Sequence, residues 1–175
     1  MTLTPFLRKF WLTLHVALSV GFLGAVAAFL ALGVNGLISQ EPQTVRGVYL
    51  AMELITWSII VPLSFASLVT GLVSSLGTVW GLFRHYWVLL KLLLTVLVAI
   101  VLLLQTQSIG YLASVVDERV LSGADHYALR ISLVVHAAGG LLVLLVITTL
   151  SVYKPQGLTR YGWRTLREQG TKPRA

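Results

Sequence analysis

The chain has 175 residues, of which 57% are hydrophobic and only 11% are charged, and its net charge is +7. A soluble domain carries about 25% charged residues, so this composition argues against a soluble protein and favours a membrane protein. The absence of cysteine excludes disulfides, iron–sulfur clusters and thioether attachment of haem.

The first predicted membrane span covers residues 10–38. Thr4 is the expected N-cap and Pro5 the first helical residue, because these residue types favour those positions. The apolar stretch from Leu12 to Val34 is longer than the about 7–15 residues of a signal-peptide core, so we interpret it as a retained helix. Small residues at steps of three and four predict one face for close helix contact, comprising Ala17, Gly21, Gly24, Ala28, Ala31 and Asn35.

The second predicted span covers residues 48–76, after a short polar connection over residues 39–47. Pro62 lies inside this span and is expected to kink it, because proline frees a backbone carbonyl one turn earlier. One stripe at helical spacing carries most of the small and polar side chains of the span, so we expect it to face the bundle interior. The stripe comprises Glu53, Trp57, Ile60, Ser64, Ser67, Gly71 and Ser74.

The third predicted span covers residues 86–106 and contains the most apolar run of the chain, in which Lys91 is the only charge. About 20 such residues at a rise of 1.5 Å cross a hydrocarbon core of about 30 Å. Arg84 and Lys91 lie only at the start of the run, beside aromatic residues, a pattern that marks the cytoplasmic interface. This helix is therefore expected to run outward.

The fourth predicted span covers residues 126–153 and begins after Asp125, a suitable cap for a helix N-terminus. The connection before it, residues 107–124, is the longest and is expected to hold a short surface helix around residues 111–121. Four small residues follow His136 in the middle of the span. They leave room for a neighbouring helix or a flat cofactor.

These patterns predict an all-α fold, a four-transmembrane-helix bundle with both termini cytoplasmic and a basic cytoplasmic tail over residues 154–175. Basic residues favour the cytoplasmic side of a membrane. With this topology ten of the thirteen lie there: Arg8, Lys9, Arg84, Lys91, Lys154, Arg160, Arg164, Arg167, Lys172 and Arg174. The tail is also expected to attract anionic lipid, at about 1 kcal/mol per basic residue near the surface.

Ionisable side chains within spans are costly, so each is a candidate site. Glu53 and Arg130 lie at similar depth, one to two turns below the outer surface, and are predicted to form an ion pair or an outer-facing solute site. His15 lies near the inner surface, level with Lys91. Four hydroxyl residues of similar depth complete a predicted second polar layer, namely Ser74, Ser75, Thr148 and Thr149.

Haem b is the cofactor that the intramembrane histidines His15 and His136 suggest, since helix bundles hold haem between facing histidines. The two residues differ in depth by about 18–20 Å at 1.5 Å per residue, so they cannot ligate one iron within a single chain. A haem on one histidine, or across a dimer interface, is the form that stays open. No cofactor is predicted in the leading interpretation.

Metal-site and enzyme signatures are missing from the sequence. A metal cluster needs three or four converging ligands, and no single span provides that spacing. No nucleophile–base pair, phosphate loop or dinucleotide fingerprint is present. The sequence therefore does not support an enzyme.

Three stretches carry a resemblance to known proteins: residues 14–25, residues 76–88 and residues 154–162. The chain resembles a family of uncharacterised four-span bacterial integral membrane proteins, and its first span is also similar to that of the copper-resistance D membrane domain. The resemblance implies a plasma-membrane four-helix protein with no assigned activity. A copper role would be carried by His15 alone, and a chain with only two methionines offers few thioether ligands for copper.

The leading functional hypothesis is an accessory or scaffold protein of the bacterial plasma membrane that is not an enzyme. Its expected partners are the lipid bilayer and a second copy or another membrane protein, and no nucleic acid. One alternative is an electron-transfer protein that binds haem b through His136 or His15. The other is a small-solute or ion transporter around Glu53, Arg130 and His136.

Overall fold

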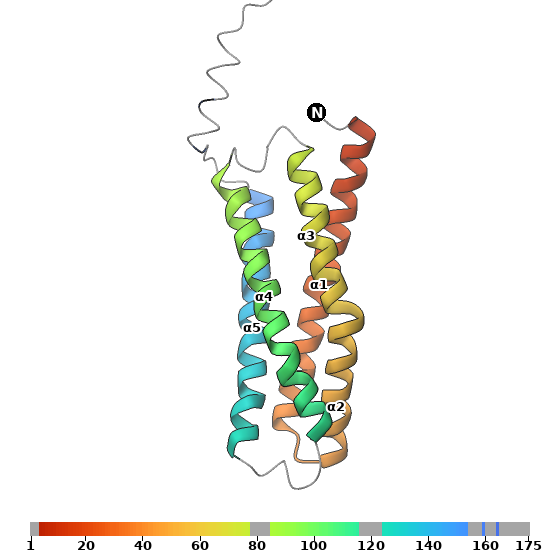
Figure 1. Cartoon of the computed structure of the whole chain (residues 1–175), viewed down its shortest axis with the longest axis vertical. Helices are drawn as coiled ribbons and strands as arrows, with labels where there is room; N and C mark the ends of the chain where they lie inside the picture. Colours follow the sequence, from red (N-terminus) through yellow and green to blue (C-terminus); the bar gives the residue numbers. More distant parts are fainter. Residues whose placement is uncertain (1–3, 78–84, 116–123, 154–158, 160–163, 165–175) are drawn as a thin grey trace, which may run out of the picture.

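The computed structural model describes residues 4–77, 85–115 and 124–153, together with Thr159 and Arg164. In this part of the chain the elements are α1 (Pro5–Ile38), α2 (Pro42–Ile55), the π-helical segment η1 (Thr56–Ile60), α3 (Val61–Leu76), α4 (Tyr86–Val115) and α5 (Ala124–Tyr153). Because α2, η1 and α3 are continuous, the described chain forms four long helices packed lengthwise (Figure 1). The predicted all-α four-helix bundle is confirmed.

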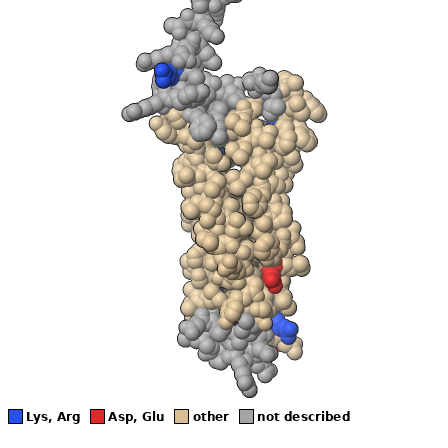
Figure 2. Space-filling model, viewed as in Figure 1, with Lys and Arg blue, Asp and Glu red and all other residues tan. Residues whose placement is uncertain are grey.

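All four helices are long and apolar enough to cross a membrane. On the face shown in Figure 2 the side of the bundle is almost free of charged residues, and the coloured charges lie toward its two ends. The start of α1 and the end of α5 lie at the same end of the bundle (Figure 1). An arrangement of this kind is suited to a multi-pass protein with both termini on one side of the bilayer.

Capping residues and prolines mark where the first two helices begin. The Thr4 side chain accepts a hydrogen bond from the Leu7 N–H, and Pro5 opens α1, which confirms the predicted cap. The second helix begins at Pro42, earlier than the predicted 48. The first turns of this helix are amphipathic, and their polar residues led us to predict a connection there. Four apolar residues recur on one face and are buried, namely Val45, Val48, Tyr49 and Met52.

The third helix runs to Val115 rather than ending near residue 106. Its last turns bury Ile109, Leu112 and Ala113, and this burial extends the helix through a stretch that had been predicted as a connection. A separate surface helix was expected around residues 111–121. The part of it up to Val115 is instead the last part of α4. The rest of that expectation and the predicted tail, apart from Thr159 and Arg164, lie outside the described residues.

Pro62 produces a wider turn in the helix. Since proline has no N–H to donate to a carbonyl one turn earlier, the preceding residues Thr56–Ile60 adopt π-helical bonding. The Val61 N–H donates to the Thr56 carbonyl, five residues back, and the Thr56 hydroxyl donates to the Met52 carbonyl at 2.7 Å.

The π-helical turn also shifts the buried face of this helix by one residue. From Ile60, the last residue of η1, into α3 the buried residues are Ile60, Ser64 and Ser67, as predicted. From α2 to the start of η1, Met52 and Thr56 are buried instead of Glu53 and Trp57. Trp57 is 55% exposed, so the predicted interior stripe is wrong at that position.

The small-residue face of α1 also differs from expectation, since all of its members are exposed on the outside of the chain: Ala17, Gly21, Gly24, Ala28, Ala31 and Asn35. Phe22, Val26 and Phe29 are buried in their place. Larger apolar side chains bury more of their surface between the helices and fill the space there better. The core they form lies mostly in the half nearer the α1–α2 connection, where it also includes residues of α2, α4 and α5.

Candidate functional site

Arg130 is buried at the end of the bundle where α1 is followed by α2, but its partners are not the predicted ones. Its guanidinium donates to the Tyr49 hydroxyl at 3.2 Å, to the Gly36 carbonyl and to the Leu37 carbonyl at 3.5 Å. Gly36 and Leu37 belong to the last turn of α1, where carbonyls lack helical partners and the helix dipole is negative. Arg130 is therefore a cap on α1 supplied by α5.

Glu53 lies elsewhere. Its Oε1 atom is 3.5 Å from the position that a Cβ on Gly110 of α4 would occupy. No ion pair joins Glu53 and Arg130 in the described parts of the chain, because the shift at η1 turns Met52 and Thr56, not Glu53, toward the core. The structure does not bring the predicted pair together.

His136 lies on the outer face of α5 rather than in the bundle core. Its side chain is exposed and its Nδ1 is 2.7 Å from the Ser132 carbonyl oxygen. Gly139 and Gly140 also face open space, since a Cβ on either would meet nothing within 4 Å. The room predicted beside His136 exists, but on the outside of this chain.

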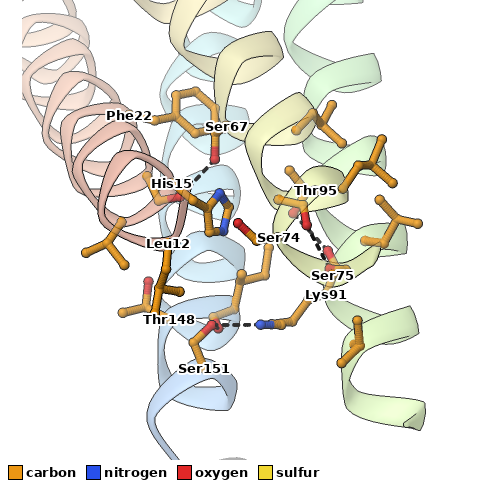
Figure 3. Close-up of a pocket in the computed structure, with 18 of the residues that line it drawn as sticks. Leu12, His15, Phe22, Ser67, Ser74, Ser75, Lys91, Thr95, Thr148 and Ser151 are labelled. Atoms are coloured by element: carbon orange, nitrogen blue, oxygen red, sulfur yellow. Dashed lines mark hydrogen bonds between the residues drawn. The ribbon is translucent and has the colours of Figure 1, made fainter. Parts of the chain in front are cut away.

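A cavity of about 710 Å³ opens at the other end of the bundle, where α1 begins and α5 ends. It lies between α1, α3, α4 and α5, and apolar side chains such as Leu12, Phe22 and Leu144 form most of its wall (Figure 3). The predicted inner polar layer also lines it, through His15, Ser74, Ser75, Lys91 and Thr148. Thr149 is exposed and donates to the Leu145 carbonyl.

Hydroxyl groups around the cavity are mostly bonded within the protein. Ser19 of α1 and Ser67 of α3 share a hydrogen bond of 2.8 Å. Ser75 and Thr148 donate to backbone carbonyls one turn earlier in their own helices. Ser74 is different: its Oγ is buried and has no hydrogen-bond partner in the described structure.

His15 crosses from α1 to α3. Its Nδ1 is 3.1 Å from Thr70 Oγ1, and the Thr70 hydroxyl in turn lies 2.7 Å from the Ala66 carbonyl. A hydroxyl has one hydrogen, and a carbonyl can only accept. The Thr70 hydrogen therefore goes to Ala66, His15 Nδ1 donates to Thr70, and the lone pair of the ring is on Nε2.

Gly71 makes this position of the ring possible. A Cβ at residue 71 would stand 2.9 Å from Cε1 of His15, closer than side-chain carbons approach. The imidazole occupies the space that the missing side chain leaves, with its Cε1 atom nearest to Gly71, and His15 also lines the cavity.

Lys91 supplies a cation at the cavity wall (Figure 3). Its Nζ donates to Ser151 Oγ at 3.1 Å and lies 4.5 Å from the centre of the Trp87 ring. Arg8 and Lys9 also line the cavity, and no acidic residue is among its lining residues in the described chain. The cavity therefore has positive electrostatic character.

Thr70 was not anticipated from the sequence. Lys91 and Ser74 were placed in the predicted inner polar layer but were not assigned as binding residues, although Lys91 is the one charge in the long apolar run of α4. That isolated charge was the signal that could have identified the cavity. No group of three or more His, Asp or Glu side chains able to hold a metal ion occurs in the described residues.

The fold and cavity define a multi-pass four-helix membrane protein with a polar, cationic pocket at one end of an apolar bundle. Comparison with family models, with curated proteins and with solved structures finds no match.

Proposed function

We propose that this protein binds an amphiphilic ligand with an acidic head group in the cavity between α1, α3, α4 and α5. The carrying observation is the lining of that cavity: an apolar wall with three basic side chains and no acidic one among the described residues. An apolar wall favours the hydrocarbon part of a ligand, and cations favour its acidic part. The accessory, non-enzymatic role expected from the sequence would then consist of holding this ligand in the membrane.

The transporter hypothesis gains less support. It placed the solute near Glu53, Arg130 and His136, and none of these residues lines the cavity. Haem b, in contrast, belongs to the proposed ligand class, since it joins an apolar macrocycle to two carboxylates. His15 is the histidine that lines the cavity.

Lys91→Gln tests the proposal. A hydrogen bond to a charged group contributes about 1.5–3 kcal/mol, so the variant should bind an acidic amphiphile roughly 10–100-fold more weakly. The probe is a palmitic acid carrying a photoactivatable diazirine, cross-linked to the full chain in detergent and mapped by peptide mass spectrometry. We expect labels on cavity residues of α1, α3 or α4 that are lost on competition with palmitic acid.

Arg46→Gln is the matched control, because Arg46 is exposed near the opposite end of the bundle, in the first turns of α2. It should leave labelling unchanged. Equal labelling of the wild type, Lys91→Gln and Arg46→Gln, or labels spread evenly over the lipid-facing surface, would overturn the proposal.

The proposed topology places the cavity at the cytoplasmic side of a bacterial plasma membrane, with both chain termini inside. The excess of basic residues that the sequence predicts on the cytoplasmic side supports it. Since the chain has no cysteine, single cysteines report without background. In intact cells a membrane-impermeant maleimide should label Gln40→Cys, between α1 and α2, and should label Arg8→Cys only after lysis. The reverse pattern would contradict the topology.

A further inference from the structure

The cavity contains a feature that binding of an acidic amphiphile alone does not use, namely a histidine with a defined free nitrogen. The hydrogen-bond chain His15–Thr70–Ala66 places the imidazole hydrogen on Nδ1. Among the described residues, the side-chain hydrogen bond of the ring is made by Nδ1, to Thr70. The nitrogen with the lone pair is thus left for whatever occupies the cavity.

Metal-binding histidines have this arrangement. Their second ring nitrogen donates a hydrogen bond to a protein oxygen, which fixes the tautomer and the ring orientation. Thr70 fills that role for His15, and Gly71 provides the space in which the ring is held. Among the described residues, no carboxylate or second histidine lines the cavity to complete a set of protein ligands for a bare metal ion. A metal at Nε2 would therefore arrive with its other ligands already in place.

We propose that the ligand of this cavity is an iron porphyrin of the haem b type, with His15 Nε2 as its axial ligand. This inference rests on the proposed function, because the porphyrin carboxylates would be the acidic groups that Lys91, Arg8 and Lys9 attract. The cavity volume of about 710 Å³ is in the usual range of small-molecule sites, about 300–1,000 Å³. The apolar wall is suited to the macrocycle.

His136 provides an internal comparison. Its Nδ1 also donates to a protein oxygen, the Ser132 carbonyl, but the side chain is exposed on the outer face of α5 and does not line the cavity. The two intramembrane histidines thus share a tautomer and differ in their surroundings. A requirement for His15 and not for His136 would show that the cavity, rather than an imidazole in a membrane, is the site.

The test is a haemin titration of the full-length protein in detergent, followed by its Soret band and compared with protein-free micelles. The wild type and His136→Ala should bind one haemin per chain with the same shifted band. His15→Ala should lose this band, and in His15→Gly added imidazole should restore it. Lys91→Gln should weaken binding about 10–100-fold without moving the band.

Thr70 is the positioning residue in this scheme. Thr70→Val removes the acceptor of the Nδ1 hydrogen bond, and loss of such a partner typically costs about 10–100-fold in metal affinity. Thr70→Ser keeps the hydroxyl and should restore both affinity and band position. A purely structural role for Thr70 would change stability in Thr70→Val but leave the band position as in the wild type.

The outcomes separate this inference from the proposed function. If the palmitic acid probe labels the cavity in a Lys91-dependent way but no His15-dependent Soret band forms, the inference is overturned and the proposed function stands. If the band depends on His136 and not on His15, the inference is also overturned, and the haem belongs to the outer face of α5. Failure of both probe and haemin would overturn both.

Discussion

Arg130→Met is expected to lower the free energy of unfolding by about 3 kcal/mol or more. The guanidinium is buried and donates to the Tyr49 hydroxyl and to two carbonyls in the last turn of α1. Without it these groups have no hydrogen-bond donor in an apolar surrounding, and hydrogen bonds to a charged group contribute about 1.5–3 kcal/mol each. Unfolding in detergent, followed by circular dichroism with increasing denaturant, measures the change.

Two further variants define what the loss means. Arg46→Met removes an exposed arginine from α2 and should change stability by less than about 0.5 kcal/mol. Tyr49→Phe removes one of the three hydrogen bonds and should cost roughly 1 kcal/mol. An Arg130→Met protein as stable as Arg46→Met would show that the arginine does not cap α1.

A double-mutant cycle separates this arrangement from the ion pair predicted from the sequence. Because Arg130 donates to the end of α1 and to Tyr49 and forms no ion pair with Glu53, the effects of Glu53→Gln and Arg130→Met should add within about 0.5 kcal/mol. A coupling well above this value would indicate the pair after all.

The number of helices could be predicted because each span is recognised by its length and hydropathy, which depend on composition alone. The rotation of each helix about its axis can be predicted only where the helix is amphipathic. In α2 the first turns are amphipathic, so Val45, Val48, Tyr49 and Met52 indicate the buried face. In α5 apolar residues occur on all sides, and nothing in the sequence pattern shows that His136 points outward.

The candidate site was predictable in part, for the same reason. Depth along a helix follows from counting residues, and counting places His15 level with Lys91 and the serines near the end of α3. Which helices stand side by side does not follow from counting. The contact between α1 and α3, which joins His15 to Thr70, depends on packing. Pro62 marks the place of η1 in the sequence, but the one-residue shift of the buried face there was not predicted. The Glu53–Arg130 prediction took account of the depth of the two residues but not of how their helices are rotated about their axes.

Gly71→Ala should have the second large effect, on stability and on the cavity together. The new Cβ would stand 2.9 Å from His15 Cε1, and the ring is held by Thr70 and cannot turn aside without losing that bond. Forcing additional carbon atoms into a packed site typically costs about 1–3 kcal/mol. Alanine also favours a helix over glycine by about 1 kcal/mol, so the measured loss underestimates the clash by that amount.

Gly24→Ala is the matched control for this overpacking. Gly24 is also in a helix interior, and a Cβ there would meet nothing within 4 Å. It should receive only the gain in helix preference and unfold at an equal or higher denaturant concentration than the wild type. Because the gain in helix preference is the same in both variants and cancels, the difference between them isolates the contact with His15, at about 1–3 kcal/mol. If both variants are equally stable and Gly71→Ala also leaves the haemin spectrum unchanged, His15 does not lie against Gly71, and the tautomer argument for Nε2 loses its structural basis.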